Sequence, residues 1–131
     1  MLIGCLAAAG CGSNDQPESV ASHAPVVSAF VSRNLALPLY PGARPTASGI
    51  YVRRRHQPEV FAAYYRSADP ISKVEPFYQS RLPKGSLKMY VNEADGGTAD
   101  FSFSQGRYAK QVVLASDQAG TLIQLTSSAK K

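Results

Sequence analysis

The stretch Asp69–Leu82, DPISKVEPFYQSRL, is the one segment of this 131-residue chain with a clear helical pattern. Its apolar residues recur at intervals of three and four and form one stripe: Ile71, Val74, Tyr78 and Leu82, with Phe77 beside it. Pro83 and Gly85 then end the helix. We expect the stripe to pack against a sheet formed by the rest of the chain.

The start of this helix can be placed in two ways. Asp69 is a good N-cap, and Pro70 suits the first helical position because its missing N–H has no intrahelical role there. Alternatively, Ser72 and Glu75 form a capping box two or three residues later. The second placement puts Pro76 near the first turn, where a proline costs far less than the roughly 3 kcal/mol expected in a helix interior.

The segments around the helix have the period of two that is typical of strands. Two runs precede it, at residues 50–56 and 60–66, and four follow it, at residues 87–92, 101–104, 108–115 and 121–126. Turns are expected at 93–98, 105–107 and 117–120. In the third run, Leu87, Met89 and Val91 alternate with polar or larger residues and should share one face. The chain is therefore expected to be α+β, with about six antiparallel strands and one main helix on one face, in the order β-β-α-β-β-β-β.

A tight turn is expected at Tyr40-Pro41-Gly42-Ala43, because proline presets its first central torsion and glycine allows the positive φ of a type II turn. The mildly apolar segment Val26–Leu39 before it could pack on the domain edge as a short helix or strand.

The first ten residues form an apolar, small-residue run, and the chain turns polar after Cys11. Ten residues are too few to cross a bilayer, which takes about 20, but they suit the core of a cleaved export signal. Ala9, Gly10 and Cys11 resemble the bacterial lipobox, in which the cysteine becomes the lipidated first residue. Cys5 also follows such residues, but only four residues precede it, so we favour Cys11.

No Lys or Arg precedes Arg33, although export signals usually begin with a positive charge. We therefore expect the natural start codon to lie upstream of Met1. The alternative is a buried amino-terminal strand or helix with two ordinary cysteines.

This organisation predicts three parts. Residues 1–10 are a lipoprotein signal peptide, residues 11–34 are the lipidated (palmitate-bearing) cysteine and a flexible tether, and residues 35–131 are a single α+β domain. A lipid anchor would hold the domain on the membrane, facing the periplasm. Gly12 after the cysteine, by resemblance to lipoprotein sorting, favours the outer membrane in a Gram-negative cell.

The segment from about Leu37 to Thr126 resembles a group of small bacterial envelope domains without assigned function, often found in lipoproteins. The shared pattern is a YPGA-like turn, a D-x(4)-V-x-x-F-Y-x(3)-L helix and a final G-T-x-I-x-L-like strand. Tyr40–Ala43, Asp69–Leu82 and Gly120–Leu125 match these parts. Pro76 and the Arg53–Arg55 run depart from the pattern. The resemblance implies a fold and a location, and no chemistry.

Candidate catalytic or metal-binding residues are few. His23 lies in the tether, and His56, on a basic strand, is the only histidine of the expected domain. Hydrolase chemistry needs a nucleophile and a base within reach of each other. Glu93, Asp95 and Asp100 flank a hairpin turn and are more typical of a solvated turn than of a calcium site. We expect no enzyme activity, no metal and no cofactor.

The best candidate binding patch is basic and aromatic. The net charge is +5, and from Arg33 onward 14 basic minus seven acidic residues leave +7, which favours anionic partners. The expected first hairpin would cluster Tyr51, Arg53, Arg54, Arg55, His56, Tyr64 and Arg66. Arg and Tyr suit protein contacts or anionic polymers. The competing reading is a charged edge that prevents strand pairing.

Three functions remain open from the sequence. The first is a membrane-anchored, non-catalytic binding or accessory lipoprotein of the cell envelope, contacting an envelope protein or an anionic envelope polymer, with no nucleic acid expected. The second is an inhibitor or immunity-type lipoprotein against a periplasmic hydrolase, which would need a loop or strand edge shaped for an active-site cleft. The third is a cryptic enzyme with a polar pocket around His56.

Overall fold

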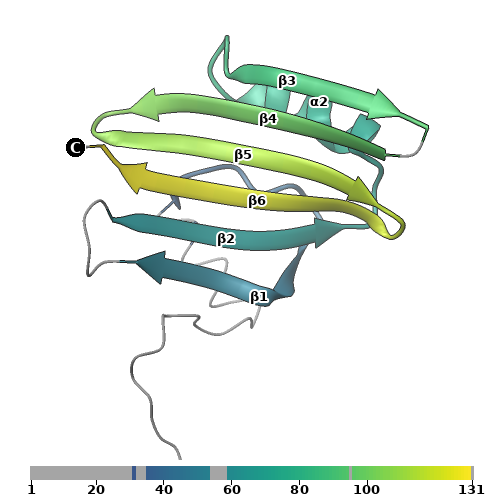
Figure 1. Ribbon diagram of the computed structural model, residues 1–131, viewed down its shortest axis with the longest axis horizontal. Helices are drawn as coiled ribbons and strands as arrows, with labels where there is room; N and C mark the ends of the chain where they lie inside the picture. Colours follow the sequence, from purple (N-terminus) through teal and green to yellow (C-terminus); the bar gives the residue numbers. More distant parts are fainter. Residues whose placement is uncertain (1–30, 32–34, 54–58, 95, 131) are drawn as a thin grey trace, which may run out of the picture.

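The computed structural model describes Val31 and residues 35–53, 59–94 and 96–130, without the side chains at positions 48, 51 and 53. These residues form six strands and one α-helix in the order β1 (Arg44–Arg53), β2 (Val60–Ser67), α2 (Ile71–Arg81), β3 (Leu87–Glu93), β4 (Gly96–Gln105), β5 (Tyr108–Asp117) and β6 (Gly120–Ala129). All neighbouring strands are antiparallel, and their order across the sheet is β1-β2-β6-β5-β4-β3 (Figure 1). The predicted α+β class and element order are confirmed. The predicted signal peptide (1–10), Cys11 and nearly all of the tether (11–34) lie outside the described residues.

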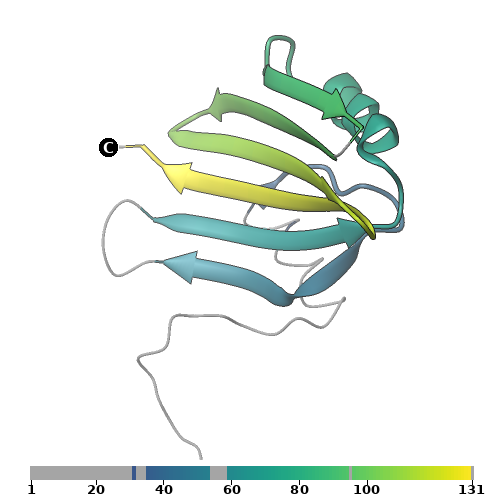
Figure 2. The ribbon, with the colours of Figure 1, turned by 45° about the vertical axis from the view of Figure 1, so that its right-hand side comes forward.

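The helical connection carries the chain from β2, the second strand at one side of the sheet, to the opposite edge. β2 is an inner strand, whereas β3, the next strand in sequence, is the edge strand at the opposite side. From β3 the chain meanders back through β4 and β5 to β6, which pairs with β2 along eight consecutive residues. The helix therefore crosses several strands on its way, and this crossing places it over one face of the sheet (Figure 2).

The helix buries the stripe that the sequence predicted. Ile71, Val74, Tyr78 and Leu82 are all buried, and Phe77 packs against them from the side. They meet alternate residues of the strands, such as Phe101 of β4, Val112 and Leu114 of β5, and Ile123 and Leu125 of β6. Beside the helix, Val31, Leu35, Leu37 and Tyr40 of the segment before β1 complete the same core. One face of the sheet is thus covered by α2 together with this lead-in segment.

The predicted helix start is wrong by one residue. The N-cap is Pro70, which is extended at φ −72° and ψ 159°, and no side chain caps the first turn. The Ser72–Glu75 capping box is also absent, because the first helical residue is Ile71 and Glu75 is buried on the core side. Pro76 consequently lies in the second turn, where it leaves one helix hydrogen bond unmade.

Asp69 is used to anchor the connection between β2 and the helix. The Tyr40 hydroxyl donates to Asp69 Oδ2 at 2.6 Å, and the Thr121 hydroxyl donates to the Asp69 carbonyl at 2.8 Å. The Asp69 N–H donates to Ser67 Oγ at 3.0 Å. The hydrogen bond that Tyr40 donates to the Asp69 carboxylate, together with the burial of Tyr40, raises the pKa of the Tyr40 hydroxyl to about 12.

The anchor brings together the three parts of the sequence pattern. The predicted turn at Tyr40–Ala43 is confirmed, since the Ala43 N–H donates to the Tyr40 carbonyl at 3.1 Å and Gly42 has a φ of +82°. At the start of β6, a Cβ on Gly120 would lie 2.0 Å from the Ser67 carbonyl oxygen, so only glycine fits there. The three parts of the sequence pattern therefore meet at one end of the sheet, through Tyr40, Asp69, Gly120 and Thr121. These residues have a structural role there.

The predicted face of β3 is wrong. A register shift between Leu87 and Met89 places Leu87 opposite the buried Phe101 but Met89 opposite Asp100, on the other face. One inserted residue reverses the faces of all later side chains in a strand. Leu87 thus packs on the core, whereas Met89 and Val91 are 45% and 41% exposed.

We predict that Tyr40→Phe lowers the free energy of unfolding by about 1–2 kcal/mol, because a hydrogen bond to a carboxylate is lost in a half-buried site. Urea unfolding followed by circular dichroism measures the change. Tyr90→Phe is the matched control, since Tyr90 is 37% exposed and its hydroxyl has no hydrogen bond among the described residues. An equal loss in both variants would contradict an anchoring role for Tyr40.

Glu75 gives a second stability prediction. It is only 4% exposed, its Oε2 has no hydrogen-bond partner in the described part of the chain, and burial raises its pKa above the usual 4.5. At neutral pH the buried negative charge of Glu75 therefore lowers the free energy of unfolding. This destabilisation disappears as the pH falls through the raised pKa to below 4.5, because the carboxyl group is then protonated in both the folded and the unfolded state. We expect Glu75→Gln to stabilise the protein at pH 7 and the gain to shrink on acidification. Glu93→Gln, at an exposed site, should show no such gain in the same unfolding series.

Candidate functional site

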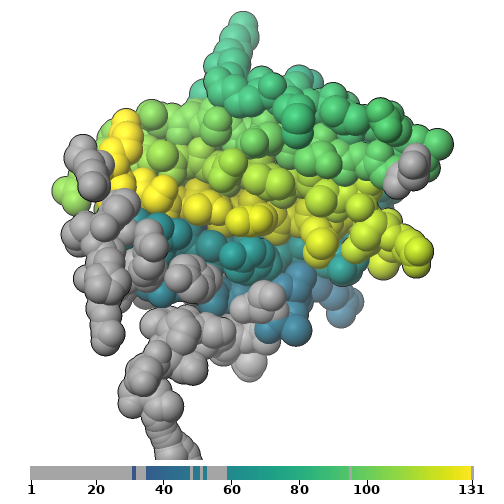
Figure 3. All heavy atoms as spheres, in the orientation of Figure 1, coloured from purple at the N-terminus to yellow at the C-terminus, as the bar shows by residue number. Residues whose placement is uncertain are grey.

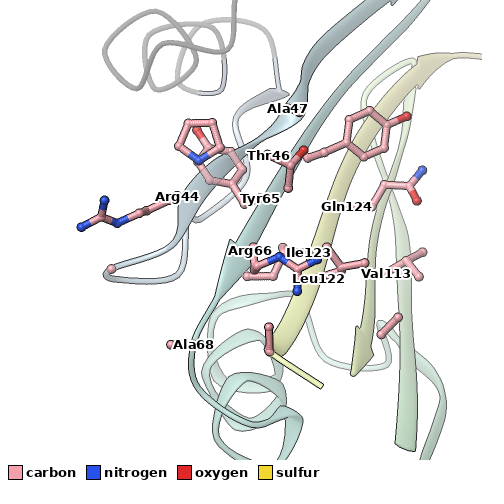
Figure 4. A pocket seen from close by; sticks show the side chains of 15 residues that line it. Arg44, Thr46, Ala47, Tyr65, Arg66, Ala68, Val113, Leu122, Ile123 and Gln124 are labelled. Atoms are coloured by element: carbon pink, nitrogen blue, oxygen red, sulfur yellow. The ribbon is translucent and has the colours of Figure 1, made fainter. Parts of the chain in front are cut away.

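The face of the sheet opposite α2 carries a hollow of about 760 Å³. In Figure 3 this face is turned toward the viewer, and α2 lies behind the strands. Strands β2, β5 and β6 form the floor, and the beginning of β1 forms one wall. The apolar lining consists mainly of Pro45, Ala47, Tyr64, Val113, Ala115 and Leu122, and the polar lining of Arg44, Thr46, Arg66 and Gln124 (Figure 4).

Alternate strand residues point away from the helix and form the floor of the hollow. Several of these residues on β2, β5 and β6 are apolar. Ile123 and Leu125 of β6 face the core, so Leu122 and Gln124, which alternate with them, face the hollow. Tyr64 of β2 and Val113 of β5 occupy the corresponding positions on their strands. Solvent-facing positions of an antiparallel sheet are usually polar, so the apolar floor makes this face a candidate contact surface.

Two arginines stand at one end of the hollow. Arg44 of β1 and Arg66 of β2 are direct cross-strand partners, and like charges in that position repel each other. Arg66 is neutralised because its guanidinium donates to Asp117 Oδ2. The same hydrogen bond lowers the pKa of Asp117, which also accepts a hydrogen bond from the Ala119 N–H.

Arg44 keeps its charge available to a ligand. Its side chain is exposed, and its guanidinium forms no hydrogen bond or ion pair with another described residue. Figure 4 shows its guanidinium extending outward at the rim, on the β1 side of the hollow. Among the described residues, the site therefore combines an apolar floor with the exposed charge of Arg44 at its edge.

The β1–β2 ladder separates two of the arginines that the predicted basic patch contains, Arg53 and Arg66. Arg53 pairs with Val60, whereas Arg66 pairs with Arg44, so the two arginines lie at opposite ends of the β1–β2 hairpin. Six positions along a strand separate these ends by about 20 Å. The structure does bring Tyr64 and Arg66 together, since residues two apart share a face and both line the hollow.

The remaining patch residues are placed only in part. Tyr51 lies opposite Ala62 and Arg53 opposite Val60 in the β1–β2 ladder, but their side chains are not described. Arg54, Arg55 and His56 lie outside the described residues, as does Asp95 of the hairpin turn.

Sequence reasoning missed Arg44, Val113 and Leu122. A signal for the last two was present, because Val112-Val113-Leu114 and Thr121-Leu122-Ile123 put apolar residues on both faces of their strands. Such runs indicate strands covered on both sides. Here the second side is the floor of the hollow.

The described lining of the hollow is poor in side chains that transfer protons. It contains no carboxylate, imidazole or thiol that could act as a general base. Within the described ranges, no three His, Cys, Asp or Glu side chains are grouped so that they could hold a metal ion. In that same part of the chain, no helix is long and apolar enough to span a bilayer.

Comparison with known proteins finds no matching family model, no matching curated protein and no matching solved structure.

We predict that the hollow binds small apolar anions. The fluorescent probe 1-anilinonaphthalene-8-sulfonate should bind the native protein, with its rings on the floor and its sulfonate near Arg44. Leu122→Asp should weaken binding about tenfold, because one buried charge opposes both the rings and the sulfonate. Arg44→Ser should weaken binding less and remove most of its salt dependence.

The control for probe binding is Lys73→Ser, which removes an exposed cation from α2, on the other face of the sheet. Fluorescence titration at low and high salt measures each affinity. If Lys73→Ser and Arg44→Ser had equal effects, the probe would be responding to net charge and not to the hollow.

Proposed function

We propose that this chain is a membrane-anchored, non-catalytic lipoprotein of the bacterial cell envelope that serves as a binding module. The observation that carries the binding role is the one-sided covering of the sheet. The helix and lead-in segment cover one face, and the other face carries a hollow with an apolar floor. The hollow is the proposed binding surface.

The location rests on the sequence. The small residues Ala9 and Gly10 before Cys11 support lipidation at Cys11, and the polar segment that follows supports a tether between the membrane and the domain. A domain held in this way would face the periplasm, with the outer membrane favoured by Gly12.

The chemistry of the hollow favours an envelope protein as partner over a uniformly charged polymer. A polymer would engage the available cation of Arg44 but leave the apolar floor in water. A protein segment with an apolar side chain next to a carboxylate would satisfy both, since the floor would bury the first and Arg44 would pair with the second.

The binding role predicts how envelope partners respond to variants. Proteins cross-linked to the wild-type chain in intact cells should be lost with Leu122→Asp and retained with Lys73→Ser. Arg44→Ser should reduce their yield by about the few-fold expected for one rim ion pair. Quantitative mass spectrometry of the cross-linked material measures the yields. Partners unchanged in Leu122→Asp would exclude the hollow as the binding surface.

The anchor is tested separately by labelling cells with radioactive palmitate. Label should enter the wild-type chain and Cys5→Ser but not Cys11→Ser, because only the lipidated cysteine carries the acyl chains. Retention of label in Cys11→Ser would move the modification to Cys5 or to another residue. A chain that takes up no label would remove the membrane anchor from the proposal while leaving the binding surface intact.

The inhibitor or immunity-type alternative has one observation in its favour. It needs a projecting loop or a strand edge, and β3 is an exposed edge with large apolar side chains. Under this alternative, partners would be lost on substituting Val91 and not Leu122, so the same cross-linking experiment separates the two functions.

A further inference from the structure

The two edge strands of the sheet differ in their ability to accept another strand. On β1, Pro45 lacks an N–H, and the register shifts between Pro45 and Ile50, so the edge is interrupted near its middle. On β3 the shift lies at the start, and the residues from Met89 to Glu93 then pair regularly with β4. Natural sheets protect their edges by prolines and bulges, and the central part of β3 has neither.

The side chains of β3 point to the same conclusion. The exposed large hydrophobic residues in the described part of the chain are Met89, Tyr90 and Val91, at 45%, 37% and 41% exposure. They are consecutive, so Tyr90 lies on the helix side of the sheet and the other two on the open side. A partner resting on one face could cover only some of them. A strand that continues the sheet would cover all three.

We propose that β3 pairs with β3 of a second copy of the chain, antiparallel and in a register centred on Tyr90. A twofold axis perpendicular to the sheet relates antiparallel strands and leaves each face on its own side, so a residue can oppose itself or a residue an even number of positions away. In the register centred on Tyr90, Tyr90 opposes its own copy and Met89 opposes the second copy's Val91.

A comparison with the register centred on Val91 shows why the register centred on Tyr90 is favoured. Centring the pair on Val91 would set Met89 against the second copy's Glu93 and Tyr90 against its Asn92, which leaves apolar side chains beside polar ones. Centring it on Tyr90 makes only apolar pairs among the three exposed residues.

Charge supports an antiparallel second copy as the occupant. Lys84 and Lys88 lie at one end of β3 and Glu93 lies at the other, and all three are exposed. Antiparallel pairing of two copies brings the basic end of each strand beside the acidic end of the other. The edge is therefore complementary to itself in charge as well as in apolar surface.

In the dimer, the six described strands of each copy would form one continuous sheet of twelve. Because the axis keeps each face on its own side, the two hollows would open in the same direction and both helices would lie on the other side. Two equivalent sites on one face could then engage one partner twice.

The register is tested by cysteine cross-linking of the full chain with Cys5→Ser and Cys11→Ser. Opposed residues have Cα atoms about 4.5–5.5 Å apart, which suits a disulfide. Tyr90→Cys should therefore give a disulfide-linked dimer under mild oxidation. Val91→Cys should give much less, because its own copy lies about 8 Å away along the diagonal. Equal cross-linking of both, or faster linking of Val91→Cys, would overturn the register.

The dimer itself is tested by sedimentation equilibrium in the same background. The chain should be a concentration-dependent mixture of monomer and dimer. Changing Met89 and Val91 together to Lys opposes like charges across the interface and should weaken association at least about tenfold. Changing Gln105 and Gln118 together to Lys, at exposed positions outside β3, adds the same two charges and should have no effect.

Self-pairing would be overturned if the Cys5→Ser, Cys11→Ser chain sediments as a monomer at every concentration and its Tyr90→Cys variant gives no disulfide-linked dimer. Circular dichroism checks that the lysine variant remains folded, which its exposed positions allow. The cysteine variants add no charge and decide the register independently of it.

Discussion

The connection between β2 and α2 depends on the hydrogen bonds of Asp69. Its carboxylate accepts from Tyr40, its carbonyl accepts from Thr121 and its N–H donates to Ser67. These contacts join the lead-in turn, the end of β2 and the start of β6 at one corner of the sheet. They fix the direction in which the chain leaves the sheet, and therefore the face that the helix covers.

The covering of that face is limited by the length of the helix. Eleven residues of α-helix extend about 16 Å, whereas six strands span about 24 Å from edge to edge. The helix crosses β3 to β6, and Val31, Leu35, Leu37 and Tyr40 of the lead-in segment share the rest of the core. No further described element is left to cover the second face, which is why its apolar residues form an open hollow.

One inserted residue in β3 has consequences on both faces. The shift after Leu87 keeps that side chain in the core and turns Met89 and Val91 to the side of the hollow. Tyr90 is left on the helix side at the very edge of the sheet. The same irregularity thus completes the core and produces an edge that is apolar on both faces, which is the basis for pairing with a second strand.

Local sequence patterns were sufficient to predict the fold class, the element order, the buried stripe of the helix and the Tyr40–Ala43 turn. These follow from local patterns, since periodicity and turn chemistry depend on residues a few positions apart. The tertiary structure alone decided the partners of Asp69, the reversal of β3 and the separation of Arg53 from Arg66. It also brought Arg44 to the rim of the hollow formed with Val113 and Leu122. Register and cross-strand neighbours arise between residues far apart in the chain, and no local pattern specifies them.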